Sequence, residues 1–99
     1  MFMVIISDGE KEGAGRRVVF EQEEVHVGRL PGNEVMLPKG DVSGYHARIK
    51  YRDGRFIVTD LRSTNGTWVN GRKISEATIV REGDAICISA FVLQLCVPS

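Results

Sequence analysis

Apolar residues along this chain occur in short runs that alternate with polar positions, with little of the spacing of an amphipathic helix. Between His46 and Tyr51, for example, Ala, Ile and Tyr alternate with His, Arg and Lys. Successive side chains of a β-strand point to opposite faces of a sheet, so this pattern predicts a strand with one buried face and His46 on the polar face. Turn residues interrupt such runs roughly every 6–12 residues, which is typical of a two-sheet sandwich or a barrel.

Two dipeptides give clear hairpin signals. Asp53-Gly54 and Asn70-Gly71 each lie between apolar runs, and both pairs tolerate the positive φ angles of tight hairpin turns. Ser89-Ala90 is predicted to form another turn, which would place Cys87 opposite Val92. The predicted strands are 1–6, 17–20, 24–28, 35–37, 46–51, 55–61, 67–69, 72–74, 79–80, 84–89 and 91–97, with a polar loop over 7–15. The sequence therefore predicts an all-β fold, a two-sheet antiparallel β-sandwich of about eleven short strands.

Length and charge narrow the function. The 99 residues fit a single domain over 1–99. Thirteen basic and thirteen acidic side chains give zero net charge, which argues against duplex DNA or an anionic membrane as partner. No apolar run approaches the ~20 residues of a membrane span, and the apolar start lacks the basic residues and length of a signal peptide. We therefore expect a cytoplasmic protein with no nucleic-acid partner and no membrane insertion.

The chain has two cysteines, Cys87 and Cys96. In the predicted hairpin they lie about four residues apart along the sheet, or ~13 Å. A disulfide needs Cα atoms within about 7 Å, so two free thiols in a reducing compartment are expected. With only two His and no ligand spacing, we expect no metal site and no cofactor.

The residues best suited to chemistry lie in three predicted loops, 28–33, 40–46 and 62–67. They combine Arg and Asn side chains and several hydroxyl groups with glycines that expose backbone N–H groups. An Arg guanidinium matches phosphate geometry, and hydroxyl and amide donors complete the shell of an oxyanion. Asp41 is the only carboxylate in the three loops. This donor set predicts a local anion-binding site on a neutral domain.

Four motifs occur in order along these loops: Gly28-Arg29, Ser43-x-x-His46, the run from Ser63 to Thr67 (Ser-Thr-Asn-Gly-Thr) and Val69-Asn70-Gly71. In this order and spacing the chain resembles the forkhead-associated (FHA) family, with the signature region over about 24–97. The resemblance implies an eleven-stranded FHA/SMAD-like β-sandwich that binds phosphothreonine through loops at one end.

The resemblance also implies roles for individual residues. Arg29 and Ser43 would contact the phosphate, and Thr64 would lie beside it. Asn65 would hydrogen-bond the backbone of the bound peptide. Relatives often carry a side chain at the position of Gly44, so in this chain only a backbone N–H would reach the peptide there.

Three more residues are implied to support the site. His46 would brace the loops, and Gly28 and Gly66 would permit the backbone shape. Tyr45 stands where a basic residue is common in the family. Independently of the resemblance, Asp60 is expected to bond loop backbone and not to be catalytic.

Ordinary structural interpretations remain open for several of these residues. Ser43 could cap a turn, Thr64 could tie its own loop together, and Asn65-Gly66 makes a good turn in any fold. Lys39 and Arg62, together with Arg48, are candidates for a positive rim or for solvated surface charge.

The function that best fits the sequence is binding of phosphothreonine-containing proteins in signalling or assembly. The alternative is a phosphate-independent interaction module. The stretch 37–40 (Leu-Pro-Lys-Gly) is similar to FHA domains fused to bacterial secretion or regulatory proteins, so the chain could be fused in cis to a larger protein. We expect no enzyme and no catalytic residue, because Ser43 and His46 have no evident third partner that would orient the His as a base.

Overall fold

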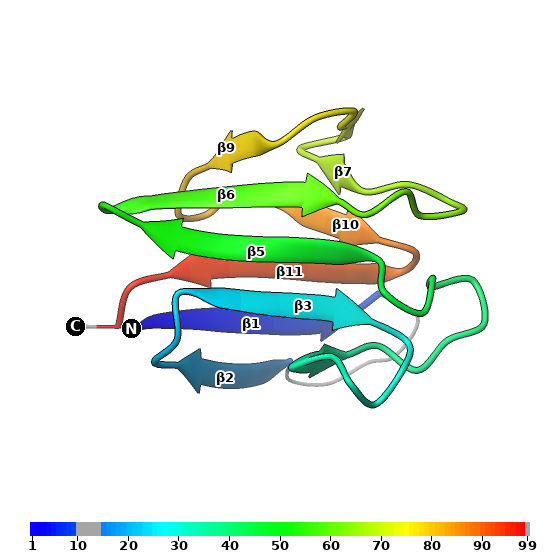
Figure 1. Ribbon diagram of the computed structural model, residues 1–99, viewed down its shortest axis with the longest axis horizontal. Helices are drawn as coiled ribbons and strands as arrows, with labels where there is room; N and C mark the ends of the chain where they lie inside the picture. The colour runs from blue at the N-terminus through cyan, green and yellow to red at the C-terminus, as the bar shows by residue number, and fades with distance from the viewer. Residues whose placement is uncertain (10–14, 99) are drawn as a thin grey trace.

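The computed structural model describes residues 1–9 and 15–98, where every regular element is a strand (Figure 1). The strands are β1 (Phe2–Asp8), β2 (Arg16–Phe20), β3 (Glu24–Gly28), β4 (Val35–Met36), β5 (Ala47–Arg52), β6 (Arg55–Asp60), β7 (Trp68–Val69), β8 (Arg72–Lys73), β9 (Thr78–Val80), β10 (Ile86–Ile88) and β11 (Phe91–Cys96). The predicted all-β class is confirmed. The first strand continues to Asp8, and positions 10–14 of the predicted 7–15 loop lie outside the described residues.

The strands form two sheets that face each other (Figure 1). The six-stranded sheet has the order β2-β1-β11-β10-β7-β8, and the five-stranded sheet the order β4-β3-β5-β6-β9. The predicted two-sheet β-sandwich is confirmed, and its strands pair antiparallel except β3 and β4, which pair in parallel with Val27 opposite Val35. The loop between them doubles back along β3, so that the Glu34 carboxylate accepts the His26 N–H at 2.6 Å before β4 begins.

Alternation along the strands builds the core between the sheets. In β11, Phe91, Leu93 and Leu95 are buried and the residues between them are only partly buried. Ala47 and Ile49 of β5 face the same core from the other sheet. Burial of apolar surface is the main term that holds two such layers together.

The turns form where the dipeptides predict them. Asp53-Gly54 has φ angles of 53° and 77°, and Asn70-Gly71 has φ angles of 49° and 82°. Ser89 also adopts a positive φ of 56° between β10 and β11, and Cys87 pairs with Val92 as expected. Both cysteines are free thiols.

The direction of three strands gathers the motif loops at one end. The strands β3 and β6 end at the same end of the five-stranded sheet at which β5 begins, because β5 pairs antiparallel with both. The loops at 29–34, 37–46 and 61–67 therefore meet at the end of the sandwich opposite the two chain termini (Figure 1).

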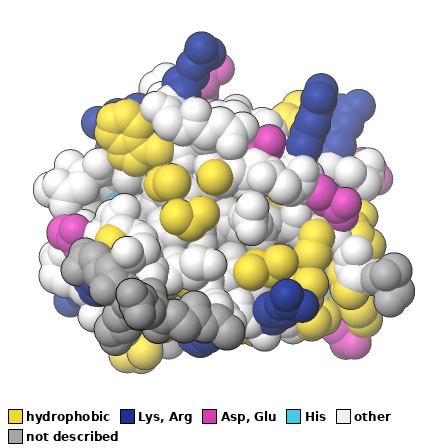
Figure 2. All heavy atoms as spheres, turned by 180° about the vertical axis from the view of Figure 1, so that it is seen from behind, with side chains coloured by type: hydrophobic (Ala, Val, Ile, Leu, Met, Phe, Trp, Pro, Cys, Tyr) yellow, Lys and Arg dark blue, Asp and Glu magenta, His cyan; other side chains and the backbone are white. Residues whose placement is uncertain are grey.

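The outer faces of the two sheets differ in character. On the five-stranded sheet, Glu24 forms ion pairs with Arg48 at 3.9 Å and Lys50 at 3.8 Å. Hydrophobic side chains gather instead over the outer side of the six-stranded sheet (Figure 2). This apolar face comprises Met3, Ile5, Val19, Trp68, Cys87, Val92 and Cys96. Within 1–9 and 15–98, no helix has the length and hydropathy needed to cross a bilayer.

The contrast between inner and outer positions predicts the effect of truncating two isoleucines. Ile49 has no exposed surface, whereas Ile79 of the same sheet is 60% exposed. We expect Ile49→Ala to lower the free energy of unfolding by about 3 kcal/mol, since it removes buried methyl groups and leaves a cavity. Ile79→Ala should change it by less than about 0.5 kcal/mol. Urea denaturation of both variants measures this, and equal losses would contradict the assignment of the core.

Candidate functional site

The three motif loops border one shallow depression of about 390 Å³. Its lining residues are Arg29, Gly40, Asp41, Val42, Ser43, Gly44, Thr64 and Asn65. All five residues predicted to contact phosphate or peptide are therefore brought together, although they come from separate loops. Their part in binding stays a prediction.

Arg29 follows the last residue of β3 and is fixed at its backbone and at its side chain. Its N–H donates to the Ser43 carbonyl at 3.0 Å, and its Nε donates to the Val42 carbonyl at 3.1 Å. Among the described residues neither Nη atom has a partner. The guanidinium is thus anchored by one edge, while its other N–H groups remain available to an anion.

Ser43 connects the loop before β5 to the loop after β6. Its Oγ accepts the backbone N–H of Thr64 at 2.9 Å. This bond uses an acceptor lone pair and leaves the hydroxyl proton to be donated to a ligand. Thr64 itself is exposed at the rim of the depression.

Asn65 makes a second connection between the same two loops. Its Nδ2 donates to the Asp41 carbonyl at 2.9 Å. The amide is thereby oriented with one N–H engaged, and its Oδ1 remains an acceptor for the N–H of an approaching backbone. The Asn65 side chain therefore links two loops and still has its Oδ1 available to accept a hydrogen bond.

The side chain of His46 lies inside the domain and links the loops that carry Ser43 and Gly66. It is completely buried, its Nδ1 accepts the Ser43 N–H at 3.1 Å, and its Nε2 lies 2.8 Å from the Gly66 carbonyl. These partners fit the neutral imidazole that carries its proton on Nε2. The alternation had placed His46 on the polar face, which is wrong because β5 begins only at Ala47 and His46 belongs to the loop.

A carboxylate organises the loop after β6. Asp60 accepts the Ser63 hydroxyl at 2.6 Å and the Thr67 hydroxyl at 2.7 Å, together with the Ser63 N–H at 3.1 Å. Partial burial raises the pKa of Asp60, but the hydrogen bonds from Ser63 and Thr67 outweigh it and leave the pKa below its ordinary value. The predicted role of Asp60 was correct, but Ser63 was not singled out. Its Oγ also accepts the Gly66 N–H at 2.9 Å.

Gly28 has a steric role. A Cβ at Gly28 would collide with the Gly44 carbonyl oxygen and would lie 2.9 Å from Nδ2 of Asn33. That Nδ2 bonds the carbonyls of Gly44 at 2.7 Å and Leu30 at 2.8 Å, so buried Asn33 ties two loops together where no sequence motif marked it. By contrast, Gly66 has a φ of 92°, where glycine is favoured.

The fold and these loops point to one family, and the profile of the FHA domain matches residues 25–89 of this chain. The chain belongs to the FHA family. Among proteins similar in sequence, the oxoglutarate dehydrogenase inhibitor of Corynebacterium glutamicum is 38% identical over 80 residues, which cover 81% of this chain and 55% of that protein.

Two solved structures extend the comparison. Mycobacterium tuberculosis EmbR in complex with a low affinity phosphopeptide superposes with a TM-score of 0.82 and 27% identity, over 96% of this chain and 24% of that chain. The FHA domain of CT664 from Chlamydia trachomatis has a TM-score of 0.87 and 24% identity, over 99% and 97% of the two chains, which supports the fold. The aligned part of this FHA chain covers between 6% and 56% of the full length of eight relatives that are similar in sequence.

Of the three basic residues considered for a positive rim, Lys39 and Arg48 form ion pairs and Arg62 is exposed in the loop after β6. Lys39 pairs with Asp8 at 3.5 Å and lies over the Phe91 ring, and Arg48 faces outward from the five-stranded sheet. The carboxylate of Asp41 accepts the Ser89 hydroxyl at 2.5 Å. Arg29 is therefore the cation that lines the depression.

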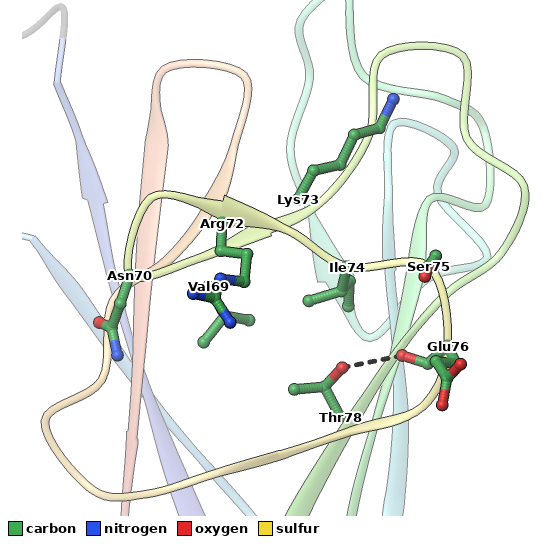
Figure 3. Close-up of a pocket in the computed structure, with 8 residues that line it drawn as sticks. All are labelled: Val69, Asn70, Arg72, Lys73, Ile74, Ser75, Glu76 and Thr78. Atoms are coloured by element: carbon green, nitrogen blue, oxygen red, sulfur yellow. Dashed lines mark hydrogen bonds between the residues drawn. The ribbon is translucent and has the colours of Figure 1, made fainter.

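A larger cavity of about 540 Å³ lies elsewhere, beside the β7–β8 hairpin (Figure 3). It is lined by Val69, Asn70, Arg72, Lys73, Ile74, Ser75, Glu76 and Thr78. None of the predicted site residues lines it. Figure 3 shows Lys73 pointing away from the other lining side chains, and its stem lies close to Gly66, where a Cβ would be 2.7 Å from Cε. The volume of a cavity alone therefore does not select the depression that the predicted site residues line.

The close approach at Gly28 predicts a steric effect. Gly28→Ala should lower the free energy of unfolding by about 2 kcal/mol, because a Cβ has no space against the Gly44 carbonyl. Gly40→Ala is the matched control, since nothing lies within 4 Å of a Cβ there, and should change stability by less than about 0.5 kcal/mol. Thermal and urea unfolding measure both. A Gly28→Ala variant as stable as the wild type would contradict the argument.

The lowered pKa of Asp60 predicts a pH dependence. Its stabilising contribution is present above the unfolded-state pKa of about 4 and is lost as the pH falls through the lower folded-state pKa. The stability difference between wild type and Asp60→Asn should therefore be largest at neutral pH and shrink below about pH 4. Denaturation across this pH range tests it, with the exposed turn variant Asp53→Asn as control. A pH-independent difference would refute the charge-based explanation.

Proposed function

We propose that this FHA domain binds protein segments that contain phosphothreonine and acts as an interaction module without catalytic activity. The observation that carries the proposal is the convergence of Arg29, Ser43, Thr64 and Asn65 on one depression. The first three supply a guanidinium and hydroxyl donors for a phosphate, and Asn65 supplies a peptide-binding amide.

In this proposal, different residues of the depression bind the phosphate and the peptide backbone. The Nη groups of Arg29 and the hydroxyl of Ser43 bind phosphate oxygens, and the Thr64 side chain completes that rim. The Oδ1 of Asn65 accepts a backbone N–H of the peptide. No hydrogen bond within the described residues uses the N–H of Gly44, so it offers the ligand another donor at the same depression.

The relatives support the same conclusion. EmbR, whose structure contains a phosphopeptide, shares the fold at 27% identity.

Both ring nitrogens of His46 are engaged by backbone groups, which leaves no base beside Ser43 for nucleophilic catalysis. Since relatives are longer than this chain, we further propose that the domain acts within a larger protein, and the free thiols favour a cytoplasmic setting.

A phosphate-independent interaction is the second candidate, because the apolar face of the six-stranded sheet includes exposed Val19 and Trp68. Large exposed apolar patches often mark protein interfaces. A partner held there would stay bound in the presence of excess phosphothreonine peptide, whereas a partner held at the depression would be displaced.

The role of Arg29 gives a direct test of the proposal. Arg29→Ala should weaken binding of a phosphothreonine peptide at least about 100-fold, because it removes charge-assisted hydrogen bonds to the phosphate. Isothermal titration with a degenerate phosphothreonine peptide library measures the effect, alongside the unphosphorylated library.

Arg52→Ala is the matched control, since Arg52 is an exposed arginine at the opposite end of β5. It should change the affinity less than about twofold. Phosphate-dependent binding that survives Arg29→Ala would overturn the site. Absence of any phosphate-dependent binding by the folded wild type would overturn the proposed function.

A further inference from the structure

The two sheets have four edge strands in the described chain, and three of these carry features that hinder pairing with a further strand. The strand β2 begins with two arginines, and β8 consists of two cationic residues. The strand β4 is followed by Pro38, and the guanidinium of Arg16 donates to the Met36 carbonyl at 3.2 Å. Charged residues, prolines and covering side chains are common means of protecting an open sheet edge.

The fourth edge strand, β9, has no such protection within its three residues. Thr78, Ile79 and Val80 carry no charge and include no proline. In the part of the chain that the structure describes, β9 pairs with β6 alone (Figure 1), and no backbone hydrogen bond joins 78–80 to a loop. Alternate residues of an edge strand point their N–H and C=O groups away from the sheet. These groups of β9 are therefore open to a further strand.

Ile79 adds an apolar contact at the centre of this edge. The neighbouring Val80 is buried in the core, whereas Ile79 is exposed on the outer side of the sheet, where it pairs with Ile57 of β6. A hollow of about 460 Å³ lies beside it, lined by residues of both β6 and β9. A single exposed isoleucine is ordinary on a protein surface. An exposed isoleucine on an unprotected edge strand, next to a hollow, suits the uptake of an extended segment.

The charge at the two ends of β9 favours an acidic segment. Arg55 and Arg81 line the hollow together with one carboxylate, Glu82, whose Oε1 already accepts the Val97 N–H at 2.6 Å. The cavity beside the β7–β8 hairpin reaches the start of β9, and the two cations of β8 and one carboxylate are in its lining (Figure 3). A second copy of this chain would bring like charges together at this edge, whereas an acidic segment would complement them.

We propose that the β9 edge, defined as residues 78–80 with Arg55 and Arg81, is a second docking site at which an extended acidic segment of a partner protein adds a strand to the five-stranded sheet. Backbone hydrogen bonds to β9 supply affinity, and an apolar residue on Ile79 and carboxylates at the two arginines supply specificity. No residue lines both the hollow and the anion-binding depression. The inference therefore does not depend on phosphothreonine binding, and both ligands can be held at once.

The test titrates the isotope-labelled chain with a blocked heptapeptide of alternating Glu and Val, up to millimolar concentration, and follows backbone amide resonances by NMR. We expect the resonances of 78–81 to shift most. The corresponding peptide of alternating Lys and Val should bind at least about tenfold more weakly, because its charge is reversed. A Glu–Val peptide with proline at its centre should also bind at least about tenfold more weakly, because proline lacks the N–H that pairs with an edge strand.

Two variants separate the edge from other apolar surface. Ile79→Ala, which should leave the stability unchanged, should weaken binding of the Glu–Val peptide about fivefold. Val19→Ala is the matched control, since Val19 is an exposed aliphatic residue of the edge strand β2, and it should leave the affinity unchanged. Each variant is first compared with the wild type by thermal unfolding. Saturation with a phosphothreonine peptide should not displace the Glu–Val peptide.

Several results would overturn the inference. These are the absence of shifts at 78–81, equal binding of the Glu–Val and Lys–Val peptides, and unchanged affinity in Ile79→Ala. Displacement by the phosphothreonine peptide would place the Glu–Val peptide at the depression, and weakening by Val19→Ala would place it on the outer face of the six-stranded sheet. Shifts at 78–81 that appear with rising concentration of the domain alone would mean that a second copy occupies the edge. Loss of phosphothreonine binding would leave the β9 edge untouched and overturn only the proposed function.

Discussion

The buried imidazole of His46 is the contact on which the site depends. It accepts the Ser43 N–H on one nitrogen and donates to the Gly66 carbonyl with the other, so one rigid ring spans two loops. Unpaired buried backbone groups are costly, and the ring satisfies two of them at once. Because both loops also carry ligand groups, the position of Ser43 relative to Thr64 follows from this bridge. The site is thereby organised before any ligand arrives, which lowers the entropic cost of binding.

A neutral protein can hold an anion here because opposite charges balance over the whole molecule, and several of its basic side chains form ion pairs. Glu24 lies between Arg48 and Lys50, and Lys39 pairs with Asp8. The long-range field is weak, in keeping with the zero net charge. In the Arg29 side chain, by contrast, the backbone carbonyl of Val42 orients the guanidinium without neutralising it. Recognition then depends on short, directional bonds and should be selective for a phosphate that fits the loops.

The features that the sequence predicted correctly involve residues close together in the chain, and the features that it missed involve residues farther apart. The alternation in 46–51 and the Asn70-Gly71 turn are local, and the strands and hairpins formed there. The motif order was enough to select residues that meet at one depression. The parallel pairing of β3 with β4 escaped prediction, because a carboxylate eight residues from its partner fixes that loop. The packing of the Leu30 side chain over Gly44 was not predicted either, because a glycine in the sequence does not show which side chain will lie over it.

The residues that line the depression bear on how this domain could distinguish one phosphoprotein from another. A phosphate group is the same in every phosphothreonine, so the affinity that we propose for Arg29 and Ser43 is one that all such peptides share. Discrimination is a difference between affinities and must come from groups that touch neighbouring residues. The role that we propose for Asn65 is a hydrogen bond to peptide backbone, which every peptide also has. Side chains other than Arg29, Ser43 and Asn65 must therefore make the identity of a flanking residue count.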